Sequence, residues 1–149
     1  MGPAGSKVVD PTFGTTILRI TDFANSGSNN CKSGYHYHPN FNQNGTRVLA
    51  TCNGWMMQYN FDPVNFTASG GTKLAVSPDG GGVYGFIYWA DKAGADVDDI
   101  YATSNGTDRL YKYNVRTGAW TLICRMTRSL PWFFPECFNG NSEAFRSRC

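Results

Sequence analysis

The chain has 149 residues, a length typical of one domain, with a formal net charge of +2 and only 16% charged residues. Its Lys and Arg residues are scattered and form no basic stripe, which argues against nucleic acid or an anionic membrane as a partner. No stretch approaches the roughly 20 apolar residues of a membrane span, so we expect no span.

The composition predicts an all-β chain. It contains 17 glycines and 7 prolines, and aromatic residues make up 15% of it. No window of ten or more residues shows helical periodicity without a Gly or Pro interruption. Short apolar runs separated by Asn-Gly turns indicate β-strands instead.

The N-terminal residues open on an isolated strand pattern. M-G-P-A-G-S lacks the apolar core of a signal peptide, so we expect residues 1–9 to be a disordered lead or a cloning scar. Thr15–Asp22 then alternates as a short strand. It is similar to Thr121–Thr127, so the chain begins on what looks like the last strand of a repeat.

An internal repeat organises the rest of the chain. Ala50–Gly54 (A-T-C-N-G) matches Ala102–Gly106 (A-T-S-N-G), and Q-Y-N-F from Gln58 matches K-Y-N-V from Lys112. A period near fifty residues with short strands is typical of a repeated β unit. The expected strands of the two units are Tyr35–His38, Arg47–Cys52, Trp55–Phe61 and Phe66–Ser69, then Phe86–Ala90, Asp99–Thr103, Arg109–Val115 and Ala119–Cys124.

The repeat motifs resemble those of bacterial β-propellers with TolB-like and WD-type blades. The similar segments include D-P-T-F-G-T from Asp10, F-N-Q-N-G-T-R-V-L from Phe41, S-P-D-G from Ser77 and L-Y-K-Y-N-V-R-T-G from Leu110. The resemblance implies four-stranded antiparallel blades, with 10–23 a closing strand, 24–69 a first blade, 70–85 a linker, 86–127 a second blade, and 128–149 a partial third blade or disordered tail.

A propeller needs about four to eight blades, and this chain holds about two and a closing strand. The ring is therefore expected to be incomplete. The missing blades can come from a longer protein or from further copies of the chain, or the two sheets can pack together as a small sandwich.

Cysteines and sequons favour an extracytoplasmic or secreted location. None of the five cysteines are spaced as C-x-x-C, which disfavours zinc; they are Cys31, Cys52, Cys124, Cys137 and Cys149. Cys31 and Cys52 could bridge the loop before the first blade to its second strand. Asn44, Asn65 and Asn105 each open an Asn-x-Thr sequon. Asn44-Gly45 and Asn105-Gly106 also suit type I′ turns, and we favour that interpretation.

The most suggestive cluster is Tyr35-His36-Tyr37-His38. On a strand, His36 and His38 would point to one face, roughly 6 to 7 Å apart, and could hold a divalent metal or an anionic sugar. The run also resembles oligogalacturonate lyases, propellers that use histidines around a metal, although two ligands are too few for a site. Histidines hydrogen-bonded to loops at a strand end are the simpler alternative, and no cofactor is expected.

Other polar and aromatic groups have structural interpretations. Asp91, Asp96, Asp98 and Asp99 lack calcium-loop spacing and predict a solvated turn, with Asp99 supporting the next strand. Tyr113 and Trp120 recur at repeat-equivalent positions and are expected in the core. Tyr88 and Trp89 align with the histidine cluster and are candidate ligand-binding residues.

These patterns predict a non-catalytic binding or scaffold segment of a propeller protein, with a glycan as its ligand. No G-x-S-x-G elbow or Ser/His/Asp arrangement is readable. A fragment of a metal-assisted uronate lyase and a two-blade unit that assembles into a ring are the alternatives.

Overall fold

The computed structural model describes residues 2–33, 39–80, 83–90, 96–104, 108–126 and 137–138. Its elements confirm the all-β expectation, since all of them except one four-residue helix are strands, and every strand pairing among them is antiparallel. They are β1 (Lys7–Val9), β2 (Thr16–Leu18), α1 (Phe23–Ser26), β3 (Cys31–Lys32), β4 (Arg47–Cys52), β5 (Trp55–Asp62), β6 (Thr67–Lys73), β7 (Val83–Trp89), β8 (Asp99–Ser104), β9 (Arg109–Asn114), β10 (Trp120–Met126) and β11 (Cys137–Phe138).

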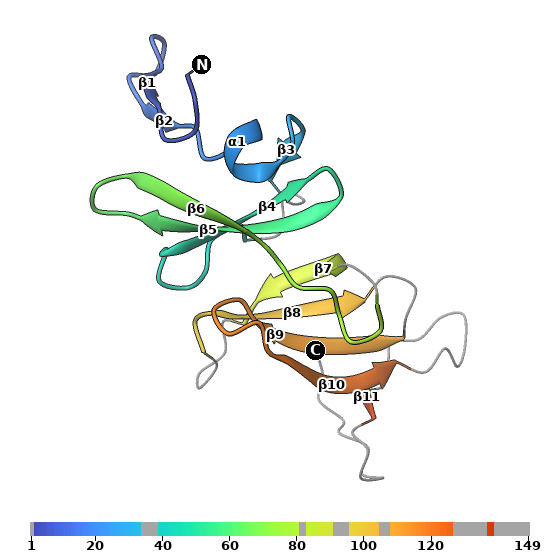
Figure 1. The fold of residues 1–149 in the computed structure, drawn as a ribbon. Helices are drawn as coiled ribbons and strands as arrows, with labels where there is room; N and C mark the ends of the chain where they lie inside the picture. The colour runs from blue at the N-terminus through green and yellow to red at the C-terminus, as the bar shows by residue number, and fades with distance from the viewer. Residues whose placement is uncertain are drawn as a thin grey trace.

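These strands form three sheets, of which two are stacked. The first large sheet has the order β3-β4-β5-β6, and the second has the order β11-β10-β9-β8-β7. Each is a meander of neighbouring strands, and the two sheets lie one above the other (Figure 1). The β1–β2 hairpin lies on the side of the first sheet away from the second (Figure 1). No closed ring is formed by the residues that the structure describes.

The core between the large sheets is built on a cross-strand row. Trp89, Ile100, Tyr113 and Trp120 lie opposite one another in register across β7, β8, β9 and β10. Because side chains alternate along a strand, this row occupies one face of the second sheet. Leu49 and the partly buried Met56 of the first sheet pack into the same cluster. The row includes Tyr113 and Trp120, whose core position was expected from the repeat.

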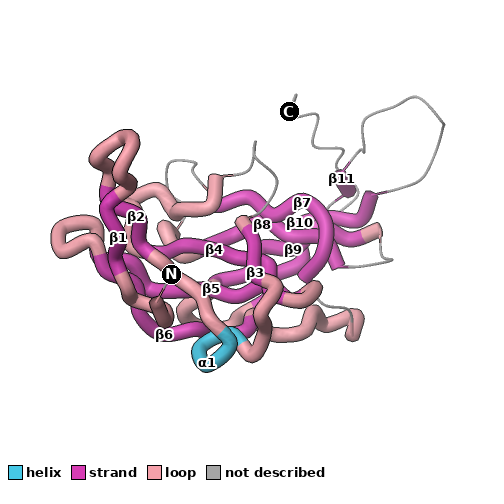
Figure 2. Tube along the Cα trace, turned by 90° about the horizontal axis from the view of Figure 1, so that it is seen from above, coloured by secondary structure: helices cyan, strands magenta, loops and turns pink. Residues whose placement is uncertain are grey.

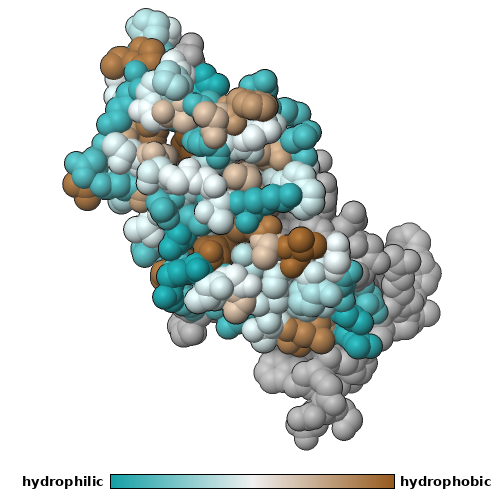
Figure 3. All heavy atoms as spheres, viewed as in Figure 1, coloured by the Kyte–Doolittle hydropathy of each residue, from teal (hydrophilic) through white to brown (hydrophobic). Residues whose placement is uncertain are grey.

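The opposite face of the first sheet is covered by N-terminal residues. Val48, Ala50, Met57 and Tyr59 form a second buried cluster there, and Ile20 packs against it. Tyr59 is fully buried. The first sheet is therefore covered on both faces. Figure 2, viewed from above, shows the N-terminal segment in front of strands of the first sheet. In Figure 3, apolar residues gather along the line where the two sheets meet, with hydrophilic residues beside them.

The Asn-Gly pairs behave differently at two turns. At Asn53-Gly54 both residues have positive φ, 49° and 82°, as a two-residue type I′ turn between β4 and β5 requires. At Asn44-Gly45 only the glycine does, so the predicted type I′ turn is wrong there. Six residues separate Phe41 from its bridge partner Val48, which is too many for a two-residue turn. Asn105-Gly106 lies outside the described residues.

The N-terminal region is more ordered than its composition suggested. Lys7–Val9, expected in a disordered lead, forms β1 and pairs with β2. The connection is closed by Asp10, whose side chain accepts hydrogen bonds from the N–H groups of Thr12 and Phe13. In the described residues β2 pairs with β1 and joins neither large sheet.

A single helical turn packs this region onto the edge of the first sheet. Asp22 and Asn25 form a reciprocal capping box, and Gly27 ends α1 in the left-handed conformation. A Cβ on Gly71 of β6 would overlap the carbonyl oxygen of Asn25. A glycine therefore permits the close approach of α1 to β6.

The strands also extend into both ends of the expected linker, 70–85. β6 continues to Lys73 through a register shift opposite Gln58–Asn60, where Gly70 has a φ of 71°. β7 already begins at Val83. Between them, the S-P-D-G segment Ser77–Gly80 forms a turn that is closed by the hydrogen bond from the Gly80 N–H to the Ser77 carbonyl.

Candidate binding site

The structure describes only some of the predicted ligand-binding residues. Tyr35, His36, Tyr37 and His38 lie outside the described residues. The backbone of Tyr88 lies on β7, opposite Tyr101 of β8. The side chain of Tyr88 is not among the described parts of the structure.

Trp89, the remaining candidate, belongs to the core. Only 4% of it is exposed, and its indole N–H donates to the Asn40 carbonyl at 3.1 Å. That bond joins the second sheet to the loop before β4. Because neither face of a buried indole is open to a ligand, we leave Trp89 out of the site.

A pocket of about 290 Å³ lies between the N-terminal segment and β4. Its walls include Leu18, Ile20, Lys32, Ser33, Asn40 and Phe41. Ser33 and Asn40 lie on either side of the His36–His38 segment in the sequence, so the chain enters and leaves that segment at the pocket wall. Phe41 is 42% exposed. Sequence reasoning missed the pocket, because Leu18 and Ile20 on one wall are distant in the sequence from the rest of the lining.

A disulfide supports one wall of the pocket. Cys31 and Cys52 are bonded, with a Cα–Cα separation of 4.0 Å, and they lie opposite one another in the β3–β4 register. This confirms the expected bridge between the loop and the second strand of the unit. The bond fixes the two-residue strand β3 against β4, and therefore fixes the start of the pocket-lining segment. Cys124 is also disulfide-bonded.

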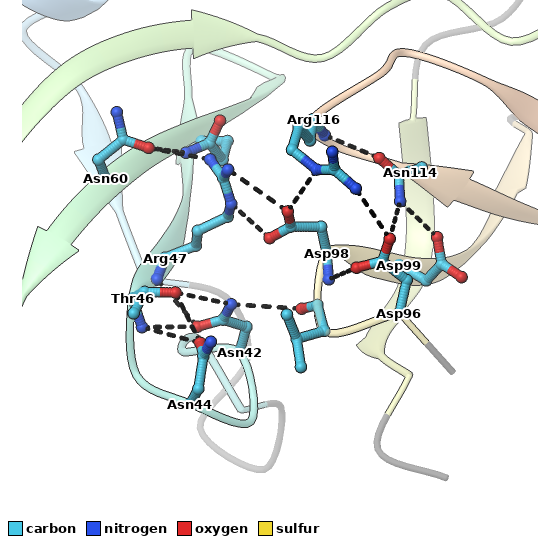
Figure 4. Close-up of polar contacts among 12 residues, drawn as sticks. Asn42, Asn44, Thr46, Arg47, Asn60, Asp96, Asp98, Asp99, Asn114 and Arg116 are labelled. Carbon is cyan, nitrogen blue, oxygen red and sulfur yellow. Dashed lines mark hydrogen bonds and ion pairs between the residues drawn. The ribbon is translucent and has the colours of Figure 1, made fainter. Parts of the chain in front are cut away.

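At the other side of β4, an ionic cluster joins the two sheets (Figure 4). Arg47 contacts both carboxylate oxygens of Asp98, through Nε and, at 3.4 Å, through Nη2. The same carboxylate accepts a hydrogen bond from Arg116 Nε at 3.1 Å. The side chains of Arg47 and Asp98 are only 18% and 9% exposed, whereas Arg116 is 59% exposed. We call Arg47, Asp98 and Arg116 the inter-sheet clasp.

The loop before β4 reinforces the inter-sheet clasp. Asn42 is 4% exposed and accepts hydrogen bonds from the N–H groups of Thr46 and Arg47, at 2.8 and 2.9 Å. Its amide nitrogen donates to the carbonyl of Val97 at 3.2 Å, next to Asp98 (Figure 4). One buried amide thus orients the loop that carries Arg47 and ties this loop to the second sheet.

The acidic loop is more buried than its sequence predicted. Asp98 and Asp99 are both buried, so the expected solvated turn is wrong at these positions. Asp99 does support the neighbouring strand, through an ion pair with Lys112 at 3.1 Å and a hydrogen bond from Asn114 at 2.8 Å. Asp91 lies outside the described residues.

Asp96, at the exposed edge of this loop, is also stabilised as a carboxylate. Its pKa is held below the ordinary value, chiefly because the backbone N–H of Asp98 donates to it, and also because Arg116 pairs with it. The bond to Asp96 in turn raises the pKa of Arg116. Among the described residues, no group of three or more His, Cys, Asp or Glu side chains is arranged to hold a metal.

A second set of polar contacts fixes the connection between the sheets. Asp79, in the Ser77–Gly80 turn, accepts a hydrogen bond from the Tyr111 hydroxyl at 2.6 Å and pairs with Arg109. Burial, and then the bond to Asp79, raises the pKa of Tyr111. The Tyr113 hydroxyl accepts a hydrogen bond from the Ala75 N–H at 3.2 Å. The connecting segment is therefore attached to β9 at several points.

Taken together, these contacts define an all-β protein with two stacked antiparallel meanders, an inter-sheet clasp and a pocket beside β4. No protein-family model matches the chain, and comparison with curated proteins and with solved structures also gives no match. In the described part of the chain, no helix has the length and apolar character needed to cross a membrane.

Proposed function

We propose that this chain is a non-catalytic binding or scaffold segment of an extracytoplasmic propeller-type protein, and that its ligand is a glycan. The observation that carries the proposal is the matching arrangement of the two stacked sheets. The segments related by the sequence repeat fall on β4 and β8 and on β5 and β9, which hold the same places in their sheets. Face-to-face stacking of such meanders is how propeller blades bury their faces.

The same alignment of the two repeats supports the packing of a further sheet on the outer face of the second sheet. Leu49, whose side chain packs toward the second sheet, corresponds in the repeat to Tyr101. Tyr101 alternates with the core residue Ile100 and therefore faces away from the first sheet. By analogy with Leu49, this outer face is suited to receive a further sheet.

The N-terminal covering of the first sheet bears on how a ring would close. In a head-to-tail ring of copies, the outer face of one second sheet would pack on the Tyr59 face of the next first sheet. That face is already covered, since Tyr59 is fully buried and Ile20 packs against its cluster. Self-assembly would need this N-terminal covering to move, and so would a last blade of a longer protein that closes the ring against the first sheet.

The pocket beside β4 supports glycan binding. It combines the exposed ring of Phe41 with an amide, two hydroxyl side chains and one ammonium group, contributed by Asn40, Thr21, Ser33 and Lys32. An apolar wall with a few convergent polar groups is typical of small-ligand sites. The Cys31–Cys52 disulfide supports an oxidising, extracytoplasmic location.

A glycan array tests this proposal. The disulfide-intact protein, displayed in multivalent form, should bind at least one class of glycan above background. Phe41→Ala should abolish that signal, and Phe13→Ala should keep it, because Phe13 is 78% exposed and is not among the pocket-lining residues. Circular dichroism should show both variants folded. No signal, or a signal that Phe41→Ala leaves unchanged in a folded protein, would count against a glycan at this pocket.

A further inference from the structure

Two of the three sequons lie in turns that the structure describes, and the side-chain amides of their asparagines differ in their hydrogen bonds. They are Asn44-Gly45-Thr46 before β4 and Asn65-Phe66-Thr67 between β5 and β6. Both Asn44 and Asn65 are exposed. N-linked glycosylation takes place at the side-chain nitrogen of such an asparagine. The contacts of Nδ2 therefore decide which sequon the fold leaves open.

In the side-chain amide of Asn44, the oxygen Oδ1 accepts hydrogen bonds, whereas the nitrogen Nδ2 donates none to the described residues. Oδ1 accepts hydrogen bonds from the Thr46 hydroxyl at 2.6 Å and from the Thr46 N–H at 3.3 Å. Nδ2 makes no hydrogen bond within the part of the chain that the structure describes. At Asn65, by contrast, Nδ2 donates to Asp62 Oδ2 at 2.7 Å. That bond is the largest contribution lowering the pKa of Asp62, so it is part of how the β5–β6 turn is held.

The turn around Asn44 is held by other residues. Asn42 supplies its internal hydrogen bonds, to Thr46 and Arg47, and the Gly45 N–H donates to the Asn42 carbonyl at 2.9 Å. Figure 4 shows Asn44 and Thr46 together at the turn, while the Arg47 guanidinium extends the other way, toward Asp98. A substituent on Asn44 Nδ2 would therefore enter solvent without replacing any of these bonds.

From this geometry we propose that Asn44 is an N-glycosylation acceptor. The inference rests on the extracytoplasmic location in the proposed function. The donor is an oligosaccharide linked to a lipid diphosphate, and a membrane-bound oligosaccharide transferase supplies the catalyst. Asn44 Nδ2 forms a bond to the anomeric carbon, the bond from that carbon to the phosphate oxygen breaks, and the lipid diphosphate leaves with the electron pair. Nδ2 releases one proton to a base of the transferase, and no group is oxidised or reduced.

Translation in the presence of endoplasmic-reticulum microsomes tests the acceptor. The full chain carries an added cleavable signal peptide, and only chains protected from external protease are counted. We expect an endoglycosidase-sensitive shift in gel mobility, with the glycan located on the Asn44 peptide by mass spectrometry. Asn44→Gln and Thr46→Val should remove that glycan. Thr46→Ser, which keeps the hydroxyl, and Asn65→Gln should retain it.

Protected wild-type chains with an unmodified Asn44 peptide would overturn the proposal, as would a glycan on Asn44 that survives Thr46→Val. A second measurement checks the structural reason. Protein whose glycan has been trimmed to its first sugar should melt within about 2 °C of the unglycosylated protein, as expected for a surface change away from other contacts. A larger shift would mean that the fold does not leave this nitrogen free. Because the added signal peptide forces entry into the lumen, this assay can succeed or fail independently of the glycan array.

Discussion

The inter-sheet clasp makes a quantitative prediction about stability. Replacing Arg47 with Met keeps much of the side-chain volume and removes the two contacts to Asp98. The Asp98 side chain is only 9% exposed, and losing one partner of a buried pair typically costs about 3–5 kcal/mol. Here Arg116 still contacts Asp98, so we expect a smaller loss, about 2 kcal/mol, which is within the range for charge-assisted hydrogen bonds.

Arg116→Met is the matched comparison, because it removes the other arginine from the same carboxylate. Its side chain is 59% exposed, so solvent screens the pair and we expect a loss of about 0.5 kcal/mol. Arg47→Met should therefore lower the melting temperature by about 4–8 °C, and Arg116→Met by about 1–2 °C. Urea unfolding monitored by tryptophan fluorescence gives both free energies of unfolding, with the slope m as a check on two-state behaviour.

A double-mutant cycle with Asp98→Asn isolates the coupling between Arg47 and Asp98. We expect a coupling energy of about 1–2 kcal/mol, because the pair is bidentate and mostly buried. The reasoning would be refuted by a coupling near zero, or by a larger loss from Arg116→Met than from Arg47→Met. Either result would mean that the Arg47–Asp98 pair contributes little to holding the two sheets together.

Three further changes should affect other parts of the fold. Gly71→Ala should lower the free energy of unfolding in urea by about 1–3 kcal/mol, because the added Cβ overlaps the carbonyl oxygen of Asn25 in α1. Ser69→Ala, on the same exposed strand, is the control and should change it by less than about 0.5 kcal/mol. Reduction of the Cys31–Cys52 bond, which closes a separation of 21 residues, should lower stability by about 3 kcal/mol, and an unchanged melting temperature in reductant would contradict this. The pKa of Asp96 is lowered in the folded protein, so the contribution of this carboxylate to stability is fully present above the ordinary value of 3.8. That contribution is lost as the pH falls through the folded-state pKa. Acid titration followed by circular dichroism should therefore show no loss of stability from Asp96 at neutral pH.

The strands and turns that the sequence predicted correctly are those set by local turn residues and by the alternation of apolar and polar side chains. Arg47–Cys52 was expected as a strand and is β4 with the same bounds, and β8 differs from Asp99–Thr103 by one residue. Asn53-Gly54 was correctly expected as a turn because two residues with positive φ suffice to join β4 and β5. Asn44-Gly45 has the same dipeptide, yet its conformation is set by Asn42 and by the length of the loop. A dipeptide alone does not specify how many residues the flanking strands leave unpaired.

The candidate site was less predictable because its walls come from distant parts of the chain. The sequence predicted a site from the cluster at His36 and His38, which lies outside the described residues, whereas the pocket beside β4 depends on Leu18 and Ile20, which precede the first repeat. Trp89 aligned with the cluster and was expected near a ligand. Its position opposite Ile100 instead places it in the core row. The alignment gave the strand correctly but could not tell which face of it meets the other sheet.

The acidic loop shows most clearly why spacing alone was insufficient. Asp96, Asp98 and Asp99 are close in sequence, and without other charges three such carboxylates would remain in solvent. Their partners are Arg116, Lys112 and Arg47, and the last is 51 residues from Asp98. Burial of Asp98 therefore requires the two sheets to be stacked already, since only the stack brings Arg47 to it. The ion pair is a consequence of the tertiary fold, and for this reason Arg47→Met tests the stacking itself.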